Sequence, residues 1–115
     1  MSAYDPFRKT LEEKLKLTQW ITQEIRKIQG VEIVFAPQTA IVGFRYFDSK
    51  KSLTELNQIN RDLLETINSD GRILLSSIEL GGKFTIRIIP FGQRTHYKQV
   101  RIAKSLIKGA IAKIT

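Results

Sequence analysis

Only a few side chains in this sequence have the type and spacing that ligand binding or proton transfer requires. Arg87 alternates with aliphatic residues in a strand-like run, and a guanidinium can hold a carboxylate through two parallel hydrogen bonds. Arg45 lies in a similar alternating run. His96, the single histidine, could carry a proton, but no carboxylate is near it in the sequence, which favours a surface or capping role. Arg87 is therefore the residue to consider first.

The sequence lacks the residues that other kinds of catalytic chemistry require. The chain has no cysteine, which excludes disulfides and thiolate chemistry and is compatible with a reducing compartment. The carboxylate pairs Glu12-Glu13 and Asp62 with Glu65 fall in helical segments, where solvated faces explain them. No spacing typical of metal ligands occurs, and no nucleophile stands beside a base. We expect no catalytic, cofactor-binding or metal-binding residue in this chain.

The elements that position Arg87 follow from capping and turn signals. A capping box at 52–55, with Ser at the N-cap and Glu at the third helical position, predicts a helix over 53–69 that Gly71 ends. Gly81-Gly82 predicts a two-residue hairpin turn between strands 72–80 and 83–90. In that register Ser76 lies opposite Arg87.

Alternation then separates two faces of this hairpin. The core face combines apolar residues with two polar ones: Ile73, Leu75, Ser77, Glu79, Phe84, Ile86 and Ile88. The other face is mixed: Leu74, Ser76, Ile78, Lys83, Thr85, Arg87 and Ile89. A cation among aliphatic residues is typical of an interface or a site wall. Arg45 is expected on the same face as Arg87, with a structural role favoured.

The rest of the chain predicts a single α+β domain over 1–115. Asp5-Pro6 begins a helix over 6–29, in which Trp20 is a core residue, and two strands follow over 31–35 and 40–47. A last helix covers 96–114, and Thr95 as its N-cap explains Arg94-Thr95. We therefore expect a four-stranded antiparallel sheet with three helices packed mainly on one face.

Composition and charge limit the size of the domain and the kinds of partner that the chain could bind. With 115 residues and 42% hydrophobic content the chain can bury one modest core. No signal-like apolar core begins it and no segment is long enough to span a bilayer, so we expect a cytoplasmic protein without a membrane partner. The net charge is +8, and every charged residue after Glu79 is basic. We prefer a solvated face of the last helix, formed by Lys98, Arg101, Lys104 and Lys108, over a surface for anionic partners.

Several ordered segments together resemble one enzyme family. They are Pro6-Phe7-Arg8, Val31-Glu32-Ile33-Val34, Ile41-Val42-Gly43-Phe44-Arg45, Leu53-Thr54-Glu55-Leu56-Asn57, Leu80-Gly81-Gly82-Lys83-Phe84, Ile86-Arg87 and Arg94-Thr95. In this order and spacing the chain resembles the C-terminal small domain of the pyridoxal-phosphate-dependent amino-acid decarboxylases, in the aromatic-amino-acid, glutamate and diaminobutyrate group. The resemblance covers nearly the whole chain.

The resemblance implies a carboxy-lyase of amino-acid metabolism whose cofactor half is not in this chain. In the family the lysine that forms the imine with pyridoxal phosphate follows a histidine, whereas His96 is followed by Tyr97. No glycine-rich phosphate loop is present. The implied partner is the large cofactor-binding domain of a parent enzyme, and a homodimer of the isolated domain is also open. We expect this chain alone to bind no cofactor and to catalyse nothing.

The resemblance also gives Arg87 a role. In the glutamate-decarboxylating branch, the arginine at the matching place binds the α-carboxylate of the substrate. The same role is implied for Arg87, and a salt bridge between domains is the equal alternative. Arg45, Ser76, Ile78 and Ile89 are expected at the interface between domains. Two other functions stay open: a basic nucleic-acid-binding module, which the lack of an exposed aromatic cluster on the predicted strands disfavours, and an assembly module for a decarboxylase subunit.

Overall fold

The computed structural model describes residues 6–35, 41–88 and 97–114. Three helices and four strands follow one another along the chain: α1 (Pro6–Arg26), β1 (Val31–Phe35), β2 (Val42–Tyr46), α2 (Leu53–Ser69), β3 (Ser76–Leu80), β4 (Lys83–Ile88) and α3 (Tyr97–Ile114). The strands form one antiparallel sheet in the order β1-β2-β4-β3. The predicted α+β class is confirmed.

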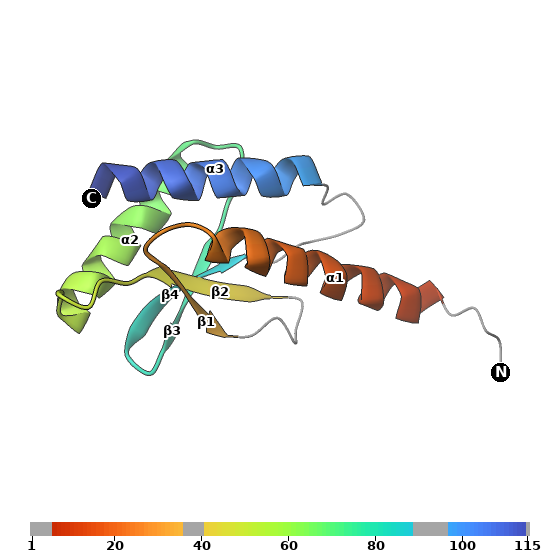
Figure 1. Cartoon of the computed structure of the whole chain (residues 1–115), viewed down its shortest axis with the longest axis horizontal. Coiled ribbons are helices and arrows are strands. Elements are labelled where there is room, and N and C mark those ends of the chain that lie inside the picture. Colours follow the sequence, from red (N-terminus) through yellow and green to blue (C-terminus); the bar gives the residue numbers. More distant parts are fainter. Residues whose placement is uncertain (1–5, 36–40, 89–96, 115) are drawn as a thin grey trace.

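One face of the sheet forms the core with all three helices. The buried apolar cluster includes Val42, Phe44, Ile86 and Ile88 from the strands, Ile21 and Ile25 from α1, Leu63 and Ile67 from α2, and Val100 and Ile107 from α3. In Figure 1, α3 runs along the top of the molecule and the strands lie below it. Since successive strand residues point to opposite faces, the other face is left without a described helix.

The β3–β4 hairpin has the predicted register. Gly81 and Gly82 have φ values of 56° and 78°, the left-handed conformation that both central residues of a type I′ turn require. Ser76 pairs with Arg87 and Leu80 with Lys83. The prediction that Ser76 lies opposite Arg87 is confirmed.

The helix α2 has the predicted boundaries because its two ends are well specified. The Ser52 hydroxyl accepts from the Glu55 amide at 3.2 Å, and the Glu55 carboxylate accepts from the Ser52 amide at 3.2 Å. This is the reciprocal capping box that the sequence predicts. At the other end Gly71 has a φ of +85°, the conformation of a residue that ends a helix.

The sequence predicts that this strand begins at residue 72, whereas β3 begins at Ser76. Just before β3, the Asn68 side chain binds both backbone groups of Leu75: its Oδ1 accepts from the Leu75 amide at 2.8 Å and its Nδ2 donates to the Leu75 carbonyl at 3.0 Å. In the register of the hairpin these two groups face the open edge of β3 and not β4. The exposed Leu74 lies before this point.

Two other elements, α1 and β2, are shorter than the sequence predicts. The helix α1 ends at Arg26, and a turn that leads to Gly30 with a φ of +89° replaces its last predicted residues. The strand β2 ends at Tyr46, although the Phe47 amide still donates to the Gly30 carbonyl at 2.8 Å and so continues the contact with the chain before β1. The predicted strand positions 40, 89 and 90 and the first predicted position of the last helix lie outside the described residues.

Candidate functional site

The face of the sheet opposite the core carries both arginines that the sequence singles out. Gly43 pairs with Arg87, so Arg45, two residues further along β2, lies on the same face. We call this surface the arginine face and define it by Glu32, Gly43, Arg45, Ser76, Ile78, Thr85 and Arg87. Ser76 and Ile78 are half-buried there, as is Arg87.

The two arginines occupy equivalent places in a repeated pattern. The units β1-β2-α2 and β3-β4-α3 each consist of two strands and a helix. Phe44 pairs with Ile86 where the units meet, and each arginine follows its unit's member of that pair by one residue. The residues opposite the arginines differ, since Glu32 lies opposite Arg45 and Ser76 lies opposite Arg87. One guanidinium therefore has a carboxylate across the strand and the other has a hydroxyl.

Both guanidinium groups are incompletely bonded. Arg45 is 1% exposed, and its Nε lies 3.6 Å from the Glu32 carboxylate, which is ion-pair distance but too long for a hydrogen bond. Nε and Nη1 of Arg45 and Nε of Arg87 have no hydrogen-bond partner. Among the described residues, these three are the buried side-chain nitrogen or oxygen atoms that lack one. Such atoms are costly, so their concentration on one face indicates that acceptors are missing there.

An aromatic ring lies over the glycine that pairs with Arg87. A β carbon placed on Gly43 would lie 2.2 Å from the Phe35 ring, so the ring lies directly over the backbone of this glycine. A register shift between Ile33 and Phe35 brings the ring to this face. This contact was not predicted from the sequence, although a glycine inside a β-strand is a signal that could have revealed it.

The other sequence candidates do not join this site. Glu12 and Glu13 lie exposed on α1, and Asp62 and Glu65 lie exposed on α2, where Asp62 accepts a hydrogen bond from Gln58 at 3.0 Å. Trp20 is partly buried against the core. Within residues 12–35, 41–88 and 100–114, no cluster of metal-ligating side chains occurs. Ile89, Arg94, Thr95 and His96 lie outside the described residues.

Three asparagines of α2 attach the sheet to this helix, and their contacts were not predicted from the sequence. Asn57 accepts from the Phe84 amide at 2.9 Å and donates to the Gly82 carbonyl at 2.8 Å. Asn60, fully buried, accepts from the Tyr46 amide at 2.7 Å. Asn68 binds Leu75, as described above. Asparagine is a poor helix former, so three of them beside an apolar stripe were a detectable signal.

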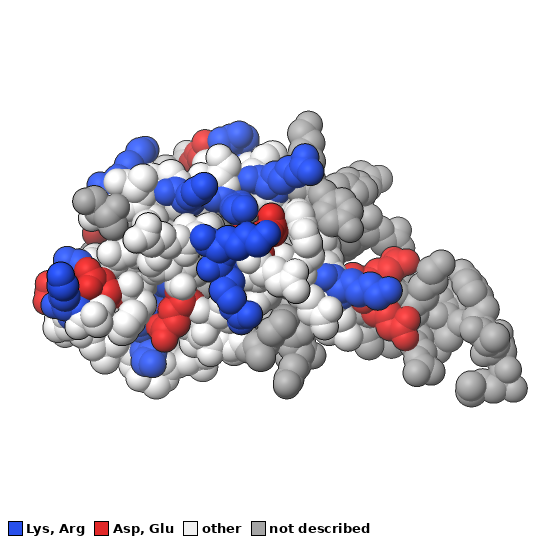
Figure 2. All heavy atoms as spheres, in the orientation of Figure 1, with Lys and Arg blue, Asp and Glu red and all other residues white. Residues whose placement is uncertain are grey.

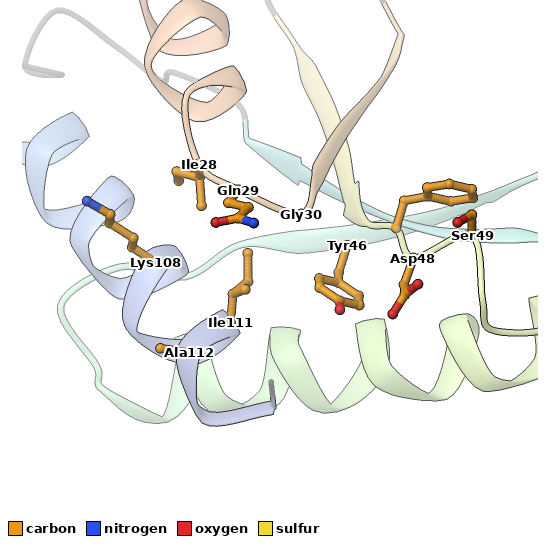
Figure 3. Close-up of a pocket in the computed structure, with 10 residues that line it drawn as sticks. Ile28, Gln29, Gly30, Tyr46, Asp48, Ser49, Lys108, Ile111 and Ala112 are labelled. Carbon is orange, nitrogen blue, oxygen red and sulfur yellow. The ribbon is translucent and has the colours of Figure 1, made fainter.

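A pocket opens on the core side of the molecule, near the end of α3. It has a volume of about 650 Å³ and lies between the turn after α1, the loop after β2 and the last turns of α3. Figure 3 shows Lys108 and Asp48 on opposite sides, with Ile111 and Tyr46 between them. Because the amine and the carboxylate do not converge, the pocket offers no acid–base pair.

The strands themselves do not fit pyridoxal phosphate. The cofactor requires a lysine amine for its aldehyde, a carboxylate for its ring nitrogen and donors for its phosphate. Lys83 is the only lysine in the four strands and lies exposed beside the hairpin turn. The arginine face can therefore hold an anion, but it lacks the residue that would hold this cofactor.

The helical side of the molecule is basic. Figure 2 shows Lys and Arg side chains gathered over α3 and the last turns of α1. Glu24 lies among them, accepting from Lys27 at 2.6 Å and from Lys104 at 3.4 Å. The hydrogen bond from Lys27, and then the charge of Lys104, hold the pKa of the Glu24 carboxyl below its ordinary value. Arg101 and Lys108 are exposed, and the Lys98 side chain lies outside the described part.

Of the helices described, none combines the length and the hydropathy that crossing a membrane would need.

Comparison with known proteins gives consistent results from sequence and structure. The chain is 32% identical over 90 residues to an aromatic-L-amino-acid decarboxylase of Bacillus atrophaeus, covering 77% of the chain and 19% of the relative. It is 30% identical over 102 residues to tyrosine decarboxylase 1 of Narcissus pseudonarcissus, covering 84% of the chain and 20% of that relative. The crystal structure of Catharanthus roseus tryptophan decarboxylase with L-tryptophan superposes with a TM-score of 0.82 at 23% identity, covering 91% of this chain and 22% of that one.

No family model matches the sequence. The chain spans about a fifth of the length of the curated relatives named above. The similarity therefore concerns one segment of such proteins and its fold.

Proposed function

We propose that this chain, which in sequence and fold matches the small domain of the pyridoxal-phosphate-dependent amino-acid decarboxylases, completes the substrate side of the active site in a parent carboxy-lyase. The observation that carries the proposal is the arginine face, where two nitrogens of Arg45 and one of Arg87 lack acceptors. The cofactor, in this proposal, is held by a large domain outside the chain. The chain alone then has no catalytic activity.

Arg87 is the residue proposed to bind substrate. Its cross-strand neighbour is Ser76, which carries no charge, so the guanidinium is not neutralised within its own hairpin. It is half-buried, which strengthens an ion pair relative to a fully solvated one. A planar guanidinium suits the α-carboxylate of an amino acid, because two N–H groups can donate to its two oxygens.

The remaining arginine-face residues support the contact between domains. Ser76 and Ile78 are half-buried beside Arg87, and Arg45 is buried on β2, which β4 separates from them. A surface that places the half-buried Arg87 among aliphatic side chains is better covered by protein than by water. Ile89, outside the described residues, belongs to the same proposal by its place in the alternation. In the absence of the large domain, two copies of the chain could pair through this face, which light scattering would detect.

A chimera tests the proposal directly. The chain replaces the corresponding segment of the Bacillus atrophaeus decarboxylase, and tyrosine, phenylalanine and tryptophan are the first substrates to assay, because the named relatives act on aromatic amino acids. We expect Arg87→Met in this chimera to lower kcat/KM by roughly 10- to 100-fold, the value of one or two charge-assisted hydrogen bonds. The absorbance of pyridoxal phosphate bound to the chimera should stay unchanged. An active, cofactor-loaded chimera that tolerates Arg87→Met would remove Arg87 from the site.

The chain alone provides the complementary test. Pyridoxal phosphate is added, reduced with borohydride, and any label is located by mass spectrometry. Absent or scattered labelling supports a cofactor held elsewhere. Stoichiometric labelling of a single lysine, with Lys83 or Lys108 as the first to inspect, would overturn the proposal. A cytoplasmic location is part of the same proposal, and cell fractionation of the parent protein would test it.

A further inference from the structure

We infer that Phe35 is a positioning residue for Arg87: its ring lies against one side of the arginine and leaves the Nη1–Nη2 end of the guanidinium open toward a carboxylate. The inference deepens the proposed function, on which it rests for the identity of that carboxylate as part of a substrate. It concerns a contact inside this chain, so the chain alone can test it.

Phe35 and Arg87 belong to one row of paired residues that crosses the whole sheet. Phe35 pairs with Gly43, Gly43 pairs with Arg87, and Arg87 pairs with Ser76. The register shift near the end of β1 brings Phe35 into this row. The ring and the arginine are therefore on the same face of the sheet, with a glycine between them.

The glycine lets the ring come close to Arg87. A β carbon on Gly43 would lie 2.2 Å from Cε1 and 2.3 Å from Cζ of Phe35, so the ring fills the space of the missing side chain. The two-residue turn makes Leu80 and Lys83 a hydrogen-bonded pair, and alternation from there makes Gly43 and Arg87 a non-hydrogen-bonded pair. The β carbons of directly opposite residues are roughly 4.5 to 5.5 Å apart and closer in pairs of this kind. The ring thus occupies the position next to the Arg87 side chain.

The exposure of the Arg87 guanidinium agrees with a ring on one side of it. Its Nε is buried without a hydrogen-bond partner, whereas the side chain as a whole is half-buried. Nη1 and Nη2 are not among the buried atoms that lack a partner, and no described residue binds them. An arginine stem can lie along an apolar surface while its charged end stays in water. The accessible part of Arg87 is therefore the end that can donate two parallel hydrogen bonds to a carboxylate.

The other arginine shows what this neighbour changes. Arg45 has Glu32 in the corresponding place on β1, and its side chain is only 1% exposed beside that carboxylate. Arg87 instead has a ring on that side, which can neither neutralise the guanidinium nor compete for its hydrogen bonds. Packing of this kind restricts the rotamers of a binding residue before the ligand arrives, which raises the affinity without a new contact.

NMR of the chain alone tests the contact. We expect nuclear Overhauser effects between the Phe35 ring protons and the δ protons and Nε–H of Arg87, and slow exchange of that Nε–H with water. Phe35→Leu should speed this exchange several-fold and weaken acetate binding at Arg87, whereas Phe35→Tyr, which keeps the ring, should preserve both. Phe84→Leu, the same change in a residue packed against the core, is the matched control and should leave the Arg87 signals unchanged. Absence of the Overhauser effects, or Arg87 signals that Phe35→Leu does not alter, would overturn the inference.

Kinetics of the decarboxylase chimera separate positioning from a structural role. We expect Phe35→Leu to raise KM several-fold at nearly unchanged kcat, because substrate binding weakens while the cofactor site is untouched, and Phe35→Tyr to restore the original KM. Loss of kcat together with bound pyridoxal phosphate would show a damaged domain and would overturn the inference. If NMR shows the contact but the chimera is inactive, the proposed parent is wrong and the positioning stands; an active, Arg87-dependent chimera without the contact gives the reverse conclusion.

Discussion

Replacing Asn60 with leucine should reveal how strongly α2 holds the strand that carries Arg45. The Asn60 side chain is fully buried and makes three hydrogen bonds: it accepts from the Tyr46 amide at 2.7 Å and donates to the carbonyls of Tyr46 at 3.1 Å and Leu56 at 2.7 Å. The strand β4 pairs with β2 only as far as Phe44, so at Tyr46 the asparagine takes the place of a strand partner. Leucine has nearly the same size but cannot donate or accept.

The magnitude follows from these three bonds. Each contributes about 1 kcal/mol net, and two buried backbone groups of Tyr46 lose their partner, so Asn60→Leu should lower the free energy of unfolding by about 3 kcal/mol. That is a large part of the roughly 5 to 15 kcal/mol expected for a domain, and it corresponds to a fall in melting temperature of roughly 10 °C.

Urea denaturation followed by far-ultraviolet circular dichroism measures this change. The matched control is Gln58→Leu on the exposed side of the same helix, where a single hydrogen bond to Asp62 at 3.0 Å is lost, and a change within about 0.5 kcal/mol is expected. A cost below about 1 kcal/mol for Asn60→Leu would refute the reasoning, because it would show that water or another group replaces the asparagine.

Three further predictions concern other parts of the fold. Ser52→Ala should cost about 1 kcal/mol by chemical denaturation. It should also raise the pKa of Glu55 in an NMR titration, because the Ser52 amide and then its hydroxyl hold that pKa below its ordinary value. A lowered folded-state pKa stabilises above the ordinary value of 4.5, so this contribution is present at neutral pH and disappears as acidification passes the lowered pKa. Gly43→Ala should destabilise by about 1 to 3 kcal/mol by forcing the Phe35 ring away, and a double-mutant cycle with Phe35→Ala should recover most of that loss; additive costs would contradict the contact. Ile107→Ala should cost about 2 to 5 kcal/mol in the same denaturation assay, since Ile107 is fully buried in the core, and a near-neutral result would mean that the helix repacks.

The sequence predicted the parts of the fold that short-range chemistry determines. The capping box and Gly71 define both ends of α2, and Gly81-Gly82 determines the register that places Ser76 opposite Arg87. These signals act over a few residues. The shared face of Arg45 and Arg87 also followed from alternation, because strand residues have a fixed period of two.

What the sequence did not predict depends on contacts between distant segments. The Asn68 side chain, near the end of α2, binds the backbone of Leu75 just before β3 begins. The position of the Phe35 ring over Gly43 needs the register shift in β1. The incomplete bonding of Arg45 requires knowledge of burial and of the Glu32 distance. No local pattern contains that information, since each depends on how two elements approach one another.

The repetition of two strands and a helix bears on how cooperatively the chain unfolds. A hairpin of two strands is marginal on its own, so neither unit has an independent reason to persist once the other has opened. The two meet along three residue pairs of β2 and β4, in the centre of the sheet, while β1 and β3 form its edges. Amide hydrogens of Phe44 and Ile86 at this junction should therefore exchange with solvent only when the whole molecule unfolds, whereas those of the outer strands can exchange through local opening. The junction that places the two arginines on one face of the sheet is in this sense also the element that makes the domain a single thermodynamic unit.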